Sequence, residues 1–199
     1  AGVALMKSPD DSQSAFTRFT INGGGEILGK ASGLNYISGT GLIVNLNNTH
    51  ITTDSSSNGG FGAIIVGCVA VNKISCREIG IPGDLEQSVT ESTLTLNGGS
   101  ATGPNVLYVH QPESHITLNT SNSAALNGNV VTATDTADSN TPTDINLSSG
   151  AALTGAVMGG GGSAGTEAGD STQRANIALN LANATWTLTG SSNLKTLSN

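Results

Sequence analysis

Two histidines flank a glutamate in the segment H-Q-P-E-S-H, where His110 and His115 bracket Glu113. Imidazole and carboxylate groups at this spacing can bind a metal ion or exchange a proton near neutral pH. However, His115 precedes an apolar residue in S-H-I-T-L, as His50 does in T-H-I-T-T and Asp144 does in T-D-I-N-L. We interpret these three as one outward-facing slot of a repeated strand, and therefore favour surface histidines over a metal or acid–base site.

Three carboxylates share the segment T-D-T-A-D-S-N-T-P-T-D, namely Asp135, Asp138 and Asp144. Their oxygens could bind Ca²⁺ in a loop, but we favour a solvated polar loop. Polysaccharide lyases need clustered carboxylates with a base, and glycoside hydrolases need two opposed carboxylates. The acids of this chain are scattered singly, so the sequence predicts no catalytic residues, no metal, no cofactor and no enzyme activity.

Other motifs give no stronger signal for chemistry. There is no G-x-S-x-G nucleophile turn, and the glycine run 159–162 lacks the Lys-Ser/Thr of a phosphate loop. Residues 159–169 have the composition of a flexible linker. Trp186 could stack on a sugar, but its alternation with Thr185 and Thr187 favours a packing role.

Cys68 and Cys76 are the two cysteines of the chain. A lone pair without further ligands of metal-site spacing is a poor zinc signal. We favour a disulfide that closes a short loop over two buried thiols in a reduced protein.

Composition narrows the class of protein. Gly, Ser, Thr and Asn make up 94 of 199 residues, while aromatic residues make up 3% and charged residues 11%. Disordered chains are usually richer in charge and proline, so we expect an ordered fold of small residues. The net charge is −7, and no Lys or Arg lies between Arg77 and Arg174. Nucleic acid and heparin-like polyanions are therefore not expected partners.

No stretch approaches the roughly 18 to 20 apolar residues that span a bilayer, so we expect no membrane insertion by this segment. Residues 1–7 lack a basic segment followed by a full apolar run and do not resemble a signal peptide. An exported form would therefore be a mature piece.

Short alternating segments recur along the chain, each followed by a Gly/Asn/Ser corner and a second apolar pair. Taking the central apolar residues as equivalent gives steps of 23, 20, 22 and 29 residues through Ile51, Ile74, Leu94, Ile116 and Ile145. Residues 183–199 repeat this pattern as a short strand, a turn and a second strand. Such self-similarity indicates a β-solenoid, with Gly and Asn at corners and hydrogen-bonded Asn and Thr ladders along the coil. Eight or so rungs at about 4.8 Å each would make a rod roughly 40 Å long. The rival fold is an antiparallel sandwich.

Residues 145–157, I-N-L-S-S-G-A-A-L-T-G-A-V, and residues 177–197, which include N-A-T-W-T-L-T-G-S-S-N-L, resemble the distal passenger region of bacterial autotransporter adhesins. The resemblance is to the pertactin-like, AIDA-like and antigen 43-like group of type V secretion. It is strong over residues 143–199, a pattern match over 85–142 and weak before that. It implies an all-β, single-stranded, right-handed parallel β-helix of about eight rungs.

The same resemblance implies a domain organisation and a location. Residues 1–84 would be an irregular β-helix start or cap, and residues 85–199 regular rungs leading toward an autochaperone and an outer-membrane barrel, both absent from this chain. The barrel would tether the passenger outside a Gram-negative cell, as a surface-displayed or secreted virulence factor. The cysteine pair departs from the family pattern, since many passengers have none.

We therefore expect a non-enzymatic adhesin that acts in autoaggregation, biofilm formation or host attachment through repeated polar contacts. Its partner would be a second copy of itself, a host glycan or a matrix protein. A structural spacer that carries another domain and a carbohydrate-active β-helix enzyme are the alternatives.

Overall fold

The structure is a computed structural model of the 199-residue chain. It describes residues 2–6, 17–30, 32–53, 62–67, 89–110, 114–133, 141–161 and 169–199. Within these ranges the fold is all-β and contains no helix. The segments that carry Cys68, Cys76, Glu113, Asp135 and Asp138 lie outside the described residues, so the predicted disulfide and the predicted loop chemistry stay predictions.

Sixteen strands form one sheet, and every strand pairing among the described residues is parallel. One isolated antiparallel bridge joins Gly159 to Asp170. The antiparallel sandwich is therefore wrong, and the largely parallel sheet is compatible with a solenoid. The strands are β1 (Val3–Met6), β2 (Thr17–Ile21), β3 (Gly25–Gly29), β4 (Ser32–Thr40), β5 (Leu42–Thr53), β6 (Gly62–Val66), β7 (Val89–Thr90), β8 (Ser92–Val109), β9 (Ile116–Ser121), β10 (Ala125–Ala133), β11 (Thr143–Ser148), β12 (Ala152–Thr154), β13 (Val157–Gly161), β14 (Ala175–Ala182), β15 (Thr185–Thr187) and β16 (Leu194–Ser198).

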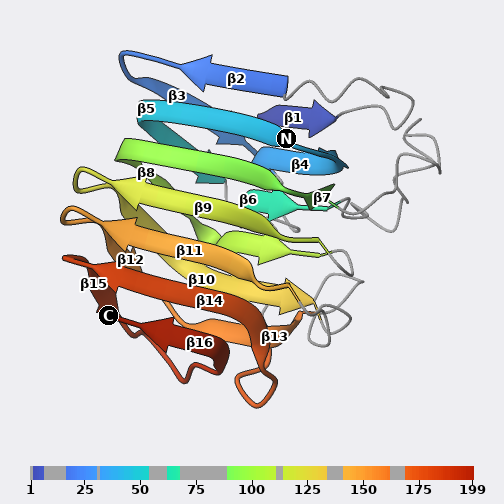
Figure 1. The fold of residues 1–199 in the computed structure, drawn as a ribbon, viewed down its shortest axis with the longest axis vertical. Coiled ribbons are helices and arrows are strands. Elements are labelled where there is room, and N and C mark those ends of the chain that lie inside the picture. Colours follow the sequence, from blue (N-terminus) through green and yellow to red (C-terminus); the bar gives the residue numbers. More distant parts are fainter. Residues whose placement is uncertain are drawn as a thin grey trace.

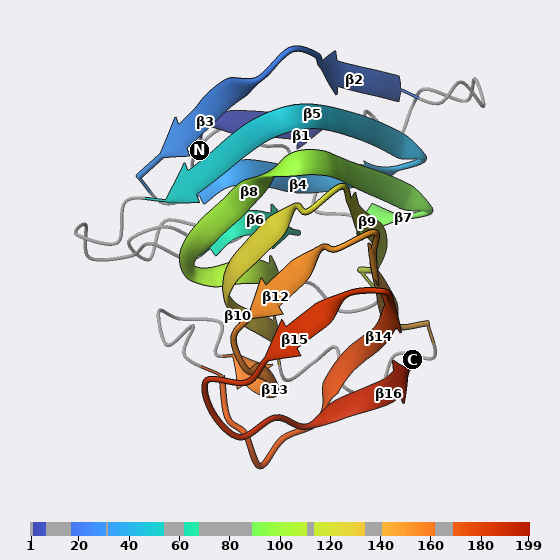
Figure 2. The same ribbon diagram turned by 90° about the vertical axis from the view of Figure 1, so that its left-hand side faces the viewer.

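The pairings arrange fifteen of the strands in three stacks, and β7 pairs with the end of β4 outside them. The first stack runs β2, β5, β8, β9, β11, β14, β16. The second runs β3, β5, β8, β10, β12, β15, and the third runs β1, β4, β6, β8, β10, β13. Long strands belong to more than one stack, because β5 and β10 bend through one corner and β8 bends through two. Figure 1 shows the first stack descending from β2 to β16, and Figure 2 shows the second stack from β3 to β15.

The register corrects the predicted equivalence of apolar residues. In the first stack Leu94 is opposite Leu118, which in turn is opposite Ile145. Ile116 instead lies opposite Ser92, and Ile51 belongs to the second stack, opposite Ala101. The same column continues above Leu94 at Phe19 and Val44 and below Ile145 at Leu179 and Leu197, with steps of 25, 50, 24, 27, 34 and 18 residues.

The corner between the first and second stacks is built from residues with positive φ. Asn48 (φ 51°), Gly98 (φ 70°), Asn122 (φ 53°) and Asn183 (φ 56°) all lie there. Left-handed backbone costs little for Gly and is better tolerated by Asn than by most residues. The prediction that Gly and Asn make the corners is confirmed at this edge.

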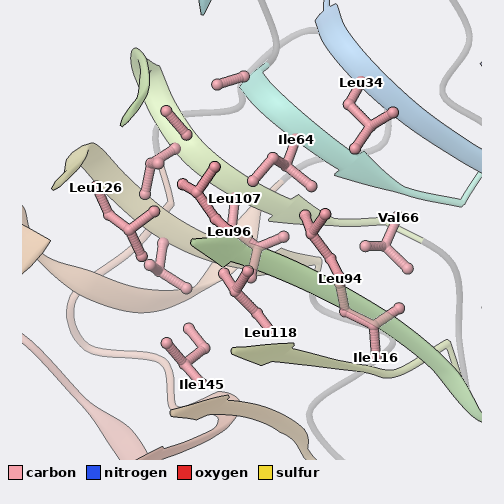
Figure 3. Packing of buried hydrophobic residues seen from close by; sticks show 14 of the residues in the cluster. Leu34, Ile64, Val66, Leu94, Leu96, Leu107, Ile116, Leu118, Leu126 and Ile145 are labelled. Atoms are coloured by element: carbon pink, nitrogen blue, oxygen red, sulfur yellow. The ribbon is translucent and has the colours of Figure 1, made fainter. Parts of the chain in front are cut away.

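Apolar side chains alternate into a single interior. In β9 and β11 the burial pattern is strictly buried then half-buried, which places every second side chain inside. Figure 3 shows Leu94, Leu118 and Ile145 from the first stack facing the same space as Leu107 and Leu126 from the other two. All five are fully buried. A dry interior of stacked apolar side chains supplies the main drive for folding.

A second apolar cluster lies on the other side of the third stack. Ile65, Tyr108 and Val131 are in register with one another, are buried and have Met158 packed against them. Their neighbours in sequence belong to the main core, so these side chains point outward from it. This cluster was not predicted, although the unbroken apolar runs at 63–66 and 106–109 are typical of strands buried on both faces.

Candidate functional site

An asparagine ladder runs along the outer side of the first stack. Asn146 Nδ2 donates to Asn119 Oδ1 at 2.9 Å, and Asn180 Nδ2 donates to Asn146 Oδ1 at 2.8 Å. The Ser198 hydroxyl then donates to Asn180 Oδ1. The four residues share one register column. Parallel strands spaced about 4.8 Å apart place identical side chains at the separation that amide ladders require.

A second ladder lies at the corner of the first and second stacks. Asn47 Nδ2 donates to Asn22 Oδ1 at 2.7 Å, and Asn97 Nδ2 donates to Asn47 Oδ1 at 3.0 Å. Asn122 Nδ2 and the Ser121 hydroxyl both donate to Asn97 Oδ1, the latter at 3.3 Å. The predicted Asn ladders are therefore confirmed, and they fix the orientation of consecutive amides over several strands.

These ladders leave hydrogen-bonding capacity at the surface. An asparagine side chain has two N–H donors and an oxygen with two lone pairs. The ladder uses one donor and one lone pair of Asn146, and this side chain is half-buried with its amide at the outer side of β11. A column of such amides offers one further donor and one further acceptor at each strand.

The first stack carries little charge on its outer side. Within its paired registers the outward ionisable side chains are Arg18 and Asp144, and on the last strand the Lys195 ammonium donates to Asn176 Oδ1 at 3.3 Å. Over all described residues there are four acids and four Lys or Arg, whereas the whole chain has 14 acids and 7 Lys or Arg. The net charge of −7 therefore comes from segments outside the described residues, where ten acids and three cations lie (14 − 4 and 7 − 4).

The outer side of the second stack has small and hydroxyl side chains. His50 Nδ1 and Ser100 Oγ are 2.9 Å apart on adjacent strands. Below them, Asn127 Nδ2 donates to Thr102 Oγ1 at 3.4 Å. Since both contacts are solvent-exposed, they hold their side chains in place less firmly than the part-buried hydrogen bonds hold the amides of the first stack.

The structure separates the histidines that the sequence placed in one slot. Asp144 is opposite Thr117 in the first stack, and not opposite His115, which comes two residues before Thr117. His50 lies in the second stack. The shared slot is therefore wrong. His50 is exposed, His115 is half-buried, and His110 is half-buried with its ring stacked on Tyr108 at 5.8 Å between centroids.

No metal centre forms within the described ranges, where no three His, Cys, Asp or Glu side chains come together. Asp144 lies on β11 as a half-buried outward residue. The glycine run also differs from the expected linker, because Gly159 is buried and belongs to β13 with Gly160 and Gly161.

Trp186 has the predicted packing role. It lies opposite Leu153 in the second stack and packs against the main core while remaining half-buried. Its indole N–H donates to the carbonyl oxygen of Gly155 at 3.0 Å. A half-buried indole N–H usually finds such a partner, and this bond joins β15 to the residue that follows β12.

Asp170 caps a turn before β14. Its Oδ1 accepts from the backbone N–H of Thr172 at 2.8 Å and from the Thr172 hydroxyl at 2.7 Å. The backbone and hydroxyl donors of Thr172 hold the pKa of this carboxyl below its usual range. The hydrogen bonds of Asp170 therefore shape a local turn. This carboxylate has no second acid or base among these partners with which it could form a catalytic pair.

No protein-family model, no curated protein and no solved structure matches this chain. Among the described residues there is no helix long and apolar enough to cross a membrane. The candidate site therefore rests on the geometry of the amide columns alone.

Proposed function

We propose that this chain is a right-handed, single-stranded parallel β-helix of about eight rungs that acts as an autotransporter adhesin passenger. In this proposal the chain is displayed on the surface of a Gram-negative cell and tethered there by an outer-membrane barrel that is not part of the sequence described. It would mediate aggregation, biofilm formation or host attachment without catalysis. Its partner would be a second copy, a host glycan or a matrix protein.

The observation that carries the proposal is the column of outward amides on a parallel stack. Each hydrogen bond to a partner has a net worth of about 1 kcal/mol, which is too little for stable attachment. Several equivalent bonds along one rigid column add up, and several molecules on one cell add avidity. The resemblance over residues 143–199 supports the export route.

The third stack supports the same proposal indirectly. Its outward cluster of Ile65, Tyr108 and Val131 is buried, whereas the asparagine ladders lie on the first stack and at its corner with the second. An adhesin of this kind would bind through the amide column of the first stack, with the third stack facing away from the partner.

A two-rung deletion tests the function. Thr93, Thr117 and Asp144 share one register. Removing residues 93–143 therefore joins Ser92 to Asp144 and places β11 where β8 begins, with every side chain on its original face. Cells that display the full chain should settle or attach, and cells that display the shortened chain at an equal level should do so much more weakly.

Equal attachment by both chains would favour the structural spacer, which needs only length and rigidity. Failure of the full chain to confer aggregation, biofilm growth or attachment would contradict the adhesin proposal. Release of new sugar ends from a polysaccharide would instead identify the carbohydrate-active alternative.

A further inference from the structure

The amide column of the first stack has a regular, uncharged pattern of donors and acceptors. Asn119, Asn146 and Asn180 are held by one another at 2.9 and 2.8 Å. Thr95 precedes Asn119 in the same register, and Ser198 follows Asn180. From Thr95 to Ser198 every strand of the stack thus offers a hydroxyl or an amide at the same position.

Because the ladder fixes each amide plane, a ligand does not have to order these side chains when it binds. Preorganisation of this kind removes an entropic cost that exposed side chains would otherwise impose. The second N–H and second lone pair of each amide are an adjacent donor and acceptor. A hydroxyl group, which donates and accepts at once, satisfies both.

The charge of the surface selects among hydroxyl-bearing ligands. The column itself, from Thr95 to Ser198, contains no ionisable residue, and Asp144 is the ionisable side chain nearest in sequence on the outer side of β11. The chain as a whole carries −7. A polyanion would be repelled by the whole molecule, and a polycation would find no acidic row along the column.

The outer side of the first stack also lacks the groups that protein interfaces use as anchors. Energetic centres of protein interfaces are rich in Trp, Tyr and Arg. Arg18, at the first strand of the stack, is the only such residue at the outward paired positions that the structure describes. A hydroxyl-rich ligand is better matched to this row than a protein surface.

We propose that the outer face of the first stack binds a neutral, linear, β-linked polysaccharide that lies along the amide column. In an extended β-linked chain successive sugars face opposite ways, so hydroxyls on one side recur at close to twice the strand spacing of about 4.8 Å, and every second sugar meets every second strand of the column. This inference rests on the proposed adhesin function and names its ligand class, because repeated weak contacts are what such a polymer provides.

Paired blocking variants test the face. Thr95→Arg with Thr117→Arg places two bulky charges on the first stack without removing a ladder amide. Thr102→Arg with Thr154→Arg does the same on the second stack and serves as the matched control. All three chains are titrated with cellohexaose and chitohexaose as neutral probes and with hyaluronan as an anionic probe, after circular dichroism has confirmed equal folding.

We expect the neutral probes to bind the unmodified chain and the second-stack control alike. The first-stack variant should lose at least about tenfold in affinity, the equivalent of one or two hydrogen bonds. Absence of neutral binding, binding of hyaluronan alone or an equal loss in both variants would overturn the proposal. So would a first-stack variant that loses self-association in sedimentation but still binds the probes.

A second measurement does not depend on the variants folding. In ¹⁵N NMR spectra of the unmodified chain, the side-chain Nδ2–H signals of Asn119, Asn146 and Asn180 should shift when cellohexaose is added, while that of Asn127 stays in place. Shifts confined to other residues would contradict the site. Adhesion that persists in cells whose purified chain ignores the neutral probes would reject the glycan and leave the adhesin function standing.

Discussion

At the scale of single residues, the ladder asparagines do more than cover the surface. Asn146 both donates and accepts within the column, so its removal leaves Asn119 and Asn180 each without one ladder partner. We expect Asn146→Ala to lower the free energy of unfolding by about 1 to 3 kcal/mol, because half-buried amides lose their partners. Urea denaturation measures this. Asn127→Ala, whose exposed bond to Thr102 is 3.4 Å long, should cost less than about 0.5 kcal/mol, and equal losses would mean that the ladder adds no stability.

The turn at Asp170 gives a second residue-scale prediction, about pH. The two donors from Thr172 lower the pKa of the carboxyl in the folded chain. The turn is therefore stabilised at pH above the ordinary carboxyl pKa, and that stabilisation is lost as pH falls through the lowered folded pKa. Thr172→Val keeps the backbone donor and removes the hydroxyl, so the Asp170 pKa should rise toward its ordinary value in an NMR titration. An unchanged titration would assign the lowered pKa to the backbone N–H of Thr172 and the side chain of Gln173.

At the scale of elements, the corner between the second and third stacks depends on glycine for close approach of the backbone. A Cβ on Gly155 would lie 2.0 Å from the carbonyl oxygen of Gly128, and one on Gly128 would lie 2.1 Å from that of Gly103. We expect Gly155→Ala to destabilise the chain by about 1 to 3 kcal/mol, the usual cost of forcing atoms into a packed site. Gly190→Ala is the control, because its Cβ would meet only the Ala156 methyl at 3.8 Å. Thermal unfolding should leave the control unchanged, and an equal shift in both would refute the close-packed corner.

The strands themselves were largely predictable, whereas their register was not. Alternation located the strands at 92–97, 143–148 and 185–187 because a half-buried strand has a period of two. The same period cannot reveal a shift of two residues in the register between neighbouring strands, because such a shift keeps every side chain on the same face of its strand. The segment H-I-T-L therefore fits equally with Ile116 or Leu118 in the core column, and pairing with β8 selects Leu118.

Corners set a further limit on what sequence can predict at this scale. The corner inside β5 is made by Asn48 without a glycine, so the sequence pattern does not distinguish Ile51 on the second side of a rung from the start of a new rung. The amide ladder was expected in kind, since Asn recurs after apolar residues. Its members could not be named without the register, because only partners on adjacent strands come within hydrogen-bond distance.

At the scale of the whole molecule, apolar side chains are buried on the middle strands of the stacks and exposed on the first and last strands. Leu118 and Leu197 share one column, yet Leu118 is fully buried and Leu197 is 54% exposed. Leu28 in β3 and Leu188 after β15 are also largely exposed, at 60% and 58%. Since each strand contacts only its neighbours in a stack, the stability of such a fold is close to a sum of neighbour terms.

This arrangement predicts a gradient of local stability along the 199-residue chain. Backbone amides of β9 and β11 have paired strands on both sides and a closed core behind them, so they should open only with the whole structure. Among the described residues, β2, β3, β15 and β16 have a paired strand on one side only. Their amides should exchange at least about tenfold faster, since a local opening there costs less. Hydrogen exchange followed by mass spectrometry measures the rates strand by strand. Leu118→Ala should raise exchange throughout the stack, because truncating a buried leucine costs about 2 to 5 kcal/mol, while Leu197→Ala should affect β16 and β14 alone. Uniform protection from β2 to β16, or equal effects of the two variants, would mean that the chain opens as one unit and that its ends are as tightly held as its middle.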